Sequence, residues 1–301
     1  MAHTAIVISD THLGRPGRAT AESLRPIWQG IDELIINGDV AEIQIPWLRN
    51  AAVREIDRLD DLTRRDGVRL TLISGNHDAY LTDRRCIQWA DGQGLIMHGD
   101  ALHDAVAPWT KSARTMKRLT RLALAEADPD DRDDLHTRLS IAQHVGHSEF
   151  LEEYVLSNRG ESSAVRALTR PWEVPPVIWY WLREPKIAMR FIERYTPQTK
   201  LLIVGHSHRP GLWRKDGRTI INTGAFTFPG RPWCAALNGS TVRVERIEKQ
   251  AGVYRRATKP IAVLEDNAFA CESLGDDRPI YTIAATAQFK RRTEQQAKNH
   301  G

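Results

Sequence analysis

The sequence predicts an α/β layered fold interrupted by a long helical insertion. Three short apolar runs near the N-terminus, 5–8, 33–36 and 68–73, alternate with segments of helical periodicity. This β-α-β-α-β order is typical of layered α/β proteins. Convincing strand patterns are then absent over 101–199, where helical periodicity takes over, and strand-like runs resume at residue 200.

Length and composition are those of a soluble globular protein. The 301 residues suffice for one large domain, and 27% charged with 41% hydrophobic residues is an ordinary balance. The net charge of +4 does not by itself indicate nucleic-acid binding. Three widely spaced cysteines favour a reducing compartment, which predicts a cytoplasmic location. No signal peptide or transmembrane segment is expected, because the longest strongly apolar stretch is well short of ~20 residues.

The first hundred residues are predicted to form alternating strands and helices. Pro46 suits the first turn of a helix in which apolar side chains recur at helical spacing, and Gly67 ends that helix. Strands are expected at 5–8, 33–36, 68–73 and 94–97, with helices at 21–29 and 46–65.

The rest of the chain divides into the insertion, a second strand region and an extension. The insertion is expected to hold helices at 108–127, 133–158 and 185–195, with a Trp/Pro-rich segment at 171–182. Strands are expected at 200–204, 212–214, 219–221, 232–237 and 242–247, and less clearly at 261–264 and 280–284. We predict a core formed by 1–100 and 200–247, a cap at 101–199, and an extension at 248–301 whose last residues, 290–301, are disordered.

Polar motifs follow five of the apolar runs directly. Parallel strands bring their carboxyl ends to one edge of a sheet, so we expect these motifs to converge. Carboxylates and imidazoles suit Mn, Fe or Zn, and a pair of metals needs a bridging carboxylate, for which Asp39 is the candidate. The motifs are Asp10-Thr11-His12, Gly38-Asp39, Gly75-Asn76-His77-Asp78, His98-Gly99-Asp100 and Gly205-His206-Ser207-His208.

In order and composition these motifs resemble those of the calcineurin-like metallophosphoesterase superfamily, which run D-x-H, G-D, G-N-H-[DE], a later His, and G-H-x-H. The resemblance covers about 4–100 and 200–247. It implies a four-layer α/β/β/α sandwich with a helical cap insertion, and an enzyme that hydrolyses phosphate esters with the help of metal ions.

The resemblance also implies a role for each motif residue. Two divalent ions are expected, with manganese favoured and iron or zinc as alternatives, and a hydroxide bridging them would attack phosphorus in line. His77 would act as general acid or charge stabiliser, with Glu42 as its orienting carboxylate. One metal would be held by Asp10, His12, Asp39 and His208, and the other by Asp39, Asn76, His98 and His206.

Several charged and aromatic residues outside the ligand set have two interpretations. Arg15 follows a motif closely and is either a phosphate ligand or an exposed loop charge. Arg114 and Arg118 belong to a basic helical stripe with Lys111 and Arg121, which either contacts an anionic substrate or membrane, or is a solvated face. The aromatic cluster Trp172, Trp179, Tyr180 and Trp181 is either core or an apolar rim. His144 and His147 share a helix face and are expected at the surface.

The sequence also has some resemblance to the UDP-2,3-diacylglucosamine pyrophosphatases, which we take as the leading subfamily. They also carry a helical insertion between an H-G-D and a G-H-x-H motif, but they have Arg where this chain has His77. The resemblance implies a phosphate-ester substrate that is lipid-linked or nucleotide-containing, with peripheral membrane contact as an option. A nuclease or cyclic-nucleotide phosphodiesterase of the same superfamily and a non-catalytic interaction module are the alternatives.

Overall fold

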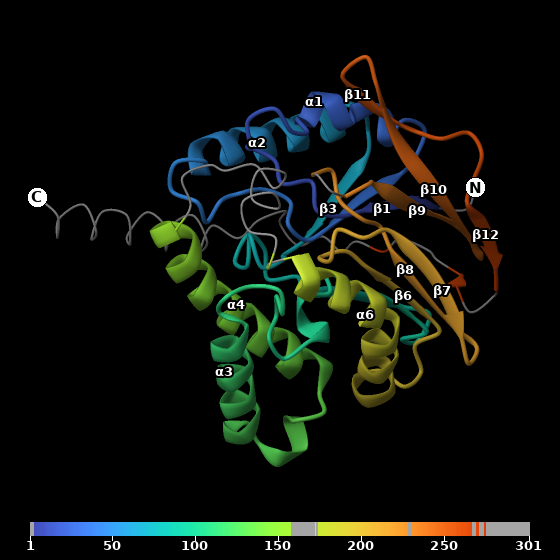
Figure 1. The fold of residues 1–301 in the computed structure, drawn as a ribbon. Coiled ribbons are helices and arrows are strands. Elements are labelled where there is room, and N and C mark those ends of the chain that lie inside the picture. The colour runs from blue at the N-terminus through green and yellow to red at the C-terminus, as the bar shows by residue number, and fades with distance from the viewer. Residues whose placement is uncertain are drawn as a thin grey trace, which may run out of the picture.

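Two β-sheets lie face to face between layers of helices in the computed structural model (Figure 1). The structure describes residues 3–157, 172, 174–227, 230–266, 269–270 and 274, and for 148–157 only the backbone. The predicted strand at 280–284 and the predicted disordered tail at 290–301 lie outside the described residues.

The first sheet is mixed and has seven strands in the described part of the chain. Its strand order is β11-β10-β9-β1-β2-β3, with β12 paired to β10. The central strands β1, β2 and β3 are parallel, and β9 runs antiparallel to β1. The strands are β1 (Thr4–Ile8), β2 (Glu33–Asn37), β3 (Arg69–Ile73), β9 (Trp233–Asn238), β10 (Thr241–Gln250), β11 (Val253–Arg256) and β12 (Ala262–Glu265).

The second sheet has the order β4-β5-β6-β8-β7, again counted over the described residues. Its strands β5, β6 and β8 are parallel. Because β5 and β6 are neighbours, the insertion leaves the sheet from one strand and returns to the adjacent one. The strands are β4 (Cys86–Trp89), β5 (Gly94–Met97), β6 (Leu201–Val204), β7 (Gly211–Lys215) and β8 (Arg218–Asn222).

Helices cover the outer face of each sheet (Figure 1). The first sheet is covered by α1 (Ala21–Leu24), the 3₁₀ turn η1 (Arg25–Ile27) and α2 (Arg49–Arg65). The second is covered by the insertion, which contains the 3₁₀ turns η2 (Asp100–Leu102) and η3 (Pro129–Asp131) and the helices α3 (Ala113–Glu126), α4 (Leu135–Ser157) and α6 (Val174–Tyr195).

Successive side chains of a strand point to opposite faces of its sheet. The strands therefore contribute to three separate hydrophobic cores, one between the sheets and one under each helical layer. In β1, Ile6 and Ile8 pack toward the α1–α2 layer, while Val7 packs between the sheets. In β6, Leu202 faces the insertion and Ile203 faces the first sheet. The four-layer α/β/β/α prediction is therefore confirmed.

The insertion supplies the fourth layer of the sandwich. Leu139 of α4 and Phe191 and Ile192 of α6 belong to the same buried cluster as Leu202 and Val204 of β6. Such packing makes the insertion a structural part of the fold. The boundaries of the core, the cap and the extension stay predictions.

Helix α6 begins at Val174, eleven residues before the expected start at Pro185. A proline inside a helix cannot donate to the carbonyl four residues earlier, which here belongs to Trp181. The Arg209 guanidinium donates to that carbonyl instead. This tertiary contact lets the Trp/Pro-rich segment continue the helix, and the sequence could not indicate it. Strands β4 and β11 were not expected either.

We predict that α4 and α6 are needed for the stability of the whole protein. Leu139 is 1% exposed, so Leu139→Ala should lower the free energy of unfolding by ~2–5 kcal/mol, the usual cost of a large-to-small core substitution. Urea unfolding followed by both circular dichroism and tryptophan fluorescence should show one shifted transition. The control is Leu122→Ala in α3, where the side chain is 48% exposed and the change should stay within ~0.5 kcal/mol. A separate early transition for the insertion would contradict the prediction.

Candidate metal centre

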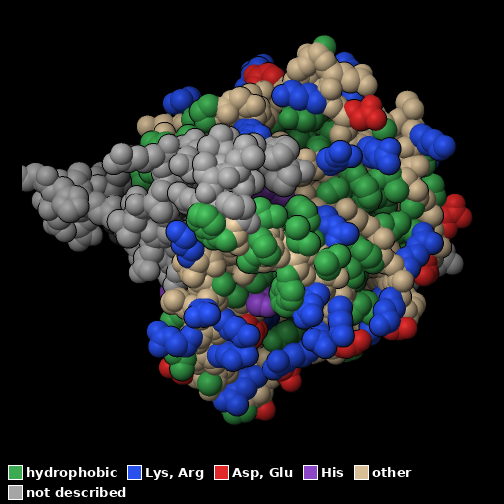
Figure 2. Space-filling model, in the orientation of Figure 1, with side chains coloured by type: hydrophobic (Ala, Val, Ile, Leu, Met, Phe, Trp, Pro, Cys, Tyr) green, Lys and Arg blue, Asp and Glu red, His purple; other side chains and the backbone are tan. Residues whose placement is uncertain are grey.

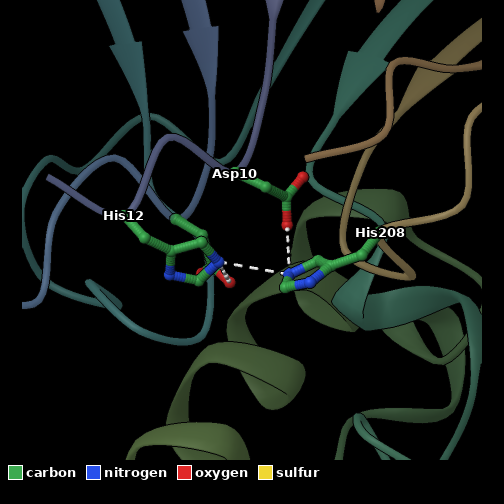
Figure 3. Close-up of side chains that lie close together, drawn as sticks. Asp10, His12 and His208 are labelled. Carbon is green, nitrogen blue, oxygen red and sulfur yellow. Dashed lines mark hydrogen bonds and ion pairs between the residues drawn. The ribbon is translucent and has the colours of Figure 1, made fainter. Parts of the chain in front are cut away.

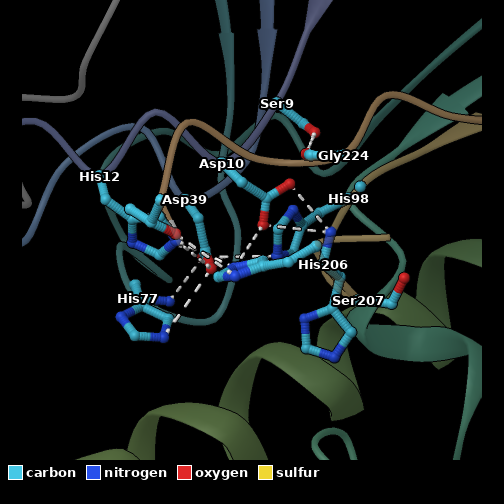
Figure 4. Close-up of polar contacts among 12 residues, drawn as sticks. Ser9, Asp10, His12, Asp39, His77, His98, His206, Ser207 and Gly224 are labelled. Atoms are coloured by element: carbon cyan, nitrogen blue, oxygen red, sulfur yellow. Dashed lines mark hydrogen bonds and ion pairs between the residues drawn. The ribbon is translucent and has the colours of Figure 1, made fainter. Parts of the chain in front are cut away.

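The five polar motifs meet where the strands of the two sheets end (Figure 4). Their side chains follow the ends of the strands by one to four residues, so the fold places all of them at one edge of the sandwich. Asp10 follows β1, Asp39 follows β2, Asn76 follows β3, His98 follows β5, and His206 and His208 follow β6.

One group of ligand atoms comes from Asp10, His12, Asp39 and His208, and these atoms all lie within 4.8 Å of one another. The His208 Nε2 atom is 3.2 Å from Asp10 Oδ1 and 3.1 Å from His12 Nε2 (Figure 3). Two imidazole nitrogens that face each other at this distance need a proton or a metal ion between them. The sequence-predicted ligand set of the first metal is thus brought together.

A second group forms around His98. Its Nε2 atom is 3.4 Å from Asp39 Oδ1 and 3.3 Å from Asn76 Oδ1. The His206 ring lies beside it, with the two ring centroids 5.1 Å apart. The His206 backbone N–H donates to the Asp10 carboxylate at 3.0 Å, which joins the last motif to the first.

The carboxylate of Asp39 lies between the two groups. Its Oδ1 atom faces His98, while its Oδ2 atom is 3.9 Å from His12 Nε2 and 3.8 Å from His77 Nε2. The side chain is 2% exposed, so both oxygens are directed into the protein. A carboxylate with its two oxygens directed at separate ligand groups has the arrangement of a bridging ligand.

Hydrogen bonds determine which nitrogen of each buried imidazole carries the proton. A carbonyl or carboxylate oxygen can only accept, so the nitrogen that faces it must donate and the other nitrogen keeps its lone pair. His12 Nδ1 donates to Glu42 at 2.8 Å, His98 Nδ1 to the Asn37 carbonyl at 3.0 Å, and His206 Nε2 to the Val106 carbonyl at 2.9 Å. In the neutral form of each ring, the remaining nitrogen of His12 and of His98 therefore faces a carboxylate, and this donor set fits divalent metal ions.

Electrostatics at the centre show an excess of buried negative charge. Burial lowers the pKa of His12 to about 4, despite its hydrogen bond to Glu42, so this ring is neutral and suited to bind metal. Burial also disfavours a charged His98, but the charges of Asp39 and Asp10 outweigh it and raise its pKa to about 10. Positive charge is therefore strongly favoured between these carboxylates.

Glu42 connects His77 to the first ligand group. Its Oε2 atom is 3.1 Å from His77 Nδ1, and its Oε1 atom accepts from His12 Nδ1. The Arg15 guanidinium also contacts this carboxylate. Burial would raise the pKa of Glu42, but the charges of His77 and Arg15 hold it well below its usual value. Glu42 thus orients two imidazoles as an anion, whereas the resemblance implied a partner for His77 alone.

Several motif residues adopt strained backbone conformations. The φ angles of Asp10, His12, Asp39, His206 and His208 all lie between 47° and 69°. Residues other than glycine rarely adopt such left-handed values, which concentrate at functional sites. Two motif glycines are required by close approach: a Cβ at Gly75 would overlap Asp39 Oδ1, and one at Gly205 would overlap Asp10 Oδ2.

Two buried contacts behind the ligands were not predicted. The Asp78 carboxylate accepts from the backbone N–H of Val40 and of Gly75, each at 2.6 Å, and so joins the second and third motifs. His147, expected at the surface, is 8% exposed, and its Nδ1 lies 2.7 Å from Gln44 Oε1. Gln44 in turn donates to the backbone carbonyl of Asn76. His144 is exposed, as expected.

Helix α6 holds the last motif from the other side. Glu184 is fully buried and accepts from Ser207 Oγ at 2.9 Å and from Asn222 Nδ2 at 2.6 Å. Burial raises the pKa of Glu184 to about 8. Trp181 Nε1 donates to the Ser207 carbonyl at 2.8 Å. Only the tertiary structure could identify this contact, because the sequence contains no motif around Glu184.

Of the three predicted substrate-binding residues, one lies near the metal ligands and two lie on an exposed helix surface. Arg15 is near the ligands through Glu42. Arg114 and Arg118 are exposed on α3. The insertion helix that borders the ligands is α4. Its Gly146 lies so close to the Asn76 loop that a Cβ atom added to this glycine would be 3.5 Å from Asn76 Cβ. Helix α3 packs on α4, so its connection to the metal centre is indirect.

This α/β/β/α sandwich, with its Asp/His cluster at one sheet edge, defines a class of metal-binding phosphoesterase folds. The family model of the calcineurin-like phosphoesterases matches residues 3–210, more than half of the chain, and the chain belongs to that family. No curated protein matches it by sequence. None of the helices in the described residues is long and apolar enough to cross a membrane.

The solved structures that match this chain share little sequence with it. Vacuolar protein sorting 29 from Cryptosporidium parvum is 12% identical, with a TM-score of 0.41, and the match covers 88% of this chain and 99% of that one. A predicted phosphoesterase from Streptococcus pneumoniae is 13% identical, with a TM-score of 0.34 and coverage of 86% and 99%. A cold-active protein-tyrosine phosphatase from a Shewanella species is 12% identical, with a TM-score of 0.39 and coverage of 85% and 80%. The family assignment depends on the family model.

We predict that Glu42→Gln weakens metal binding while the fold is retained. The amide keeps the shape of the side chain but loses the charge that orients His12, and loss of such a partner typically costs ~10–100-fold in metal affinity. Isothermal titration calorimetry of the metal-free protein with Mn²⁺ measures the affinity. Glu22→Gln, at a side chain that is 54% exposed in α1, is the matched control and should not change the affinity. Equal affinities for Glu42→Gln and wild type would contradict the assigned role.

Proposed function

We propose that this chain is a dinuclear metal-dependent phosphoesterase. The observation that carries the proposal is the position of Asp39, whose two carboxylate oxygens face two different groups of imidazoles. One ion would be held by Asp10, His12, Asp39 and His208, and the other by Asp39, Asn76, His98 and His206. Manganese is the ion proposed, with iron or zinc as alternatives.

Two divalent ions bound there would polarise the phosphoryl group and favour ionisation of an attacking water. His77 is the imidazole best placed to act on the leaving group. It is 17% exposed, and it contacts Glu42 through Nδ1, so Nε2 is directed toward the ligand cluster. Burial disfavours its charged form, but Asp39 and Glu42 outweigh burial and raise the pKa of His77, so it can donate a proton to the leaving oxygen.

The bond hydrolysed is proposed to be a phosphodiester, pyrophosphate or phosphomonoester bond of a large substrate. The leading candidates are lipid-linked or nucleotide-containing esters, as in UDP-2,3-diacylglucosamine pyrophosphatases. Arg15 would contact the phosphate at the metal centre, whereas Arg114 and Arg118 on the exposed side of α3 would bind a part of the substrate remote from phosphorus. We further propose a cytoplasmic location.

We predict that Asp39→Asn abolishes hydrolysis because both ligand groups lose a shared negative charge. Metal content after dialysis and turnover of bis-p-nitrophenyl phosphate with Mn²⁺ should both fall, turnover by roughly a hundredfold or more. Asp216→Asn, in an exposed hairpin turn, is the control and should match wild type. Wild-type protein that binds two metal ions but hydrolyses no phosphate ester would instead favour a non-catalytic module.

His77→Asn should separate metal binding from catalysis. Both ions should remain, because His77 lies outside the two proposed ligand sets, while kcat should fall by ~10²–10⁴ as for a typical acid–base residue. The loss should be smaller for esters with good leaving groups, which need less protonation. Loss of a metal ion from this variant would show that His77 is a ligand and that its proposed role is wrong.

A further inference from the structure

The N-terminal half of α6, together with Trp172 two residues before it, exposes an unusual number of large apolar side chains. Nine such side chains are exposed among the described residues, and four of them lie within 172–182. Trp172 is 66% exposed, Ile178 46%, Trp179 43% and Leu182 72%. Water-exposed tryptophan and leucine this close together mark an interaction surface rather than ordinary surface variation.

Three of these apolar side chains lie on one face of α6, and basic side chains continue that face toward the C-terminal end of the helix. Ile178, Trp179 and Leu182 are followed at helical spacing by Lys186 and Arg190, both exposed. The Arg183 guanidinium lies over the Trp179 ring, 4.7 Å from its centroid. We call the following residues the α6 face: Ile178, Trp179, Leu182, Arg183, Lys186 and Arg190.

A groove of about 470 Å³ extends this face toward β7. Its floor is apolar and includes Met189, Trp213 and Ile220, and its rim carries Lys186, Arg190 and Lys215 with one carboxylate, Glu193. Figure 2 shows hydrophobic side chains over α6 with Lys and Arg side chains beside them, and further basic side chains over α3 on the same side of the molecule. The surroundings of the apolar side chains are therefore mainly positive.

We propose that the α6 face docks on the surface of an anionic lipid bilayer. Tryptophan and leucine side chains would enter the boundary between head groups and acyl chains, while Arg183, Lys186 and Arg190 would contact the anionic head groups. The basic groove would accept head groups at its rim. This proposal concerns surface binding alone and does not depend on the proposed phosphoesterase activity.

Charge favours a membrane over a second copy of this chain. A two-fold symmetric contact through the α6 face would bring its three basic side chains close to their own copies, and like charges at an interface are unfavourable. An anionic bilayer is complementary to the same charges, and each Lys or Arg near such a surface strengthens binding roughly fivefold. A membrane also accepts exposed tryptophan without a preformed partner pocket.

Co-sedimentation with vesicles tests the proposal directly, using the full chain. Binding is expected to vesicles of phosphatidylcholine mixed with phosphatidylglycerol, to be much weaker with phosphatidylcholine alone, and to fall as salt rises. The double variant Trp179→Ala with Leu182→Ala should bind roughly tenfold more weakly, since two apolar side chains no longer enter the bilayer. The double variant Lys186→Gln with Arg190→Gln should lose roughly fivefold per charge and most of the salt dependence.

Trp47→Ala is the matched control. Trp47 is 54% exposed and precedes α2 in the opposite helical layer, so its loss should leave vesicle binding unchanged. Thermal unfolding of every variant verifies that the fold is kept. The proposal is overturned if wild type does not bind the anionic vesicles, or if Trp47→Ala weakens binding as much as the α6 variants. It is also overturned if the α6 variants instead abolish a concentration-dependent dimer while vesicle binding persists.

Discussion

The burial of two carboxylates, Asp10 and Asp39, is the constraint on which the site depends. An isolated buried carboxylate is very unfavourable unless donors or cations surround it. Here the backbone N–H groups of His206 and His77 donate to these side chains, and imidazole nitrogens face them. The left-handed backbone at five motif residues follows from this requirement, because it allows several loops to direct polar groups at one small volume.

The helical insertion is tied to this arrangement from two directions. Helix α4 reaches the Asn76 loop through His147 and Gln44, and α6 reaches the last motif through Glu184, Trp181 and the Arg209 contact. The insertion also completes the core on the second sheet. A change in the insertion would therefore affect both the stability of the sandwich and the position of the ligand loops, in contrast to a cap that only covers a substrate.

Sequence patterns predicted the sheet edge well because the signals there are local. Apolar β-branched runs that end in Gly, Asp or His indicate a strand followed by a loop, and the fold class and family that these patterns implied are confirmed. Sequence patterns failed to predict features that depend on contacts between residues far apart in the chain. The start of α6 depends on Arg209, and the burial of His147 depends on Gln44, about a hundred residues earlier in the chain.

The sequence by itself determined most strands and helices of the core, though not β4 or β11, and the set of residues at the sheet edge, since periodicity and motif chemistry are encoded over a few residues. Asp39 was already the candidate for the bridging carboxylate, but only the tertiary structure placed each of its oxygens opposite a different ligand group. Only the tertiary structure decided that Glu42 orients His12 as well as His77, and that the insertion forms the fourth layer. These features arise from contacts between segments far apart in the chain. Such contacts depend on how layers pack, and periodicity along one segment carries no information about them.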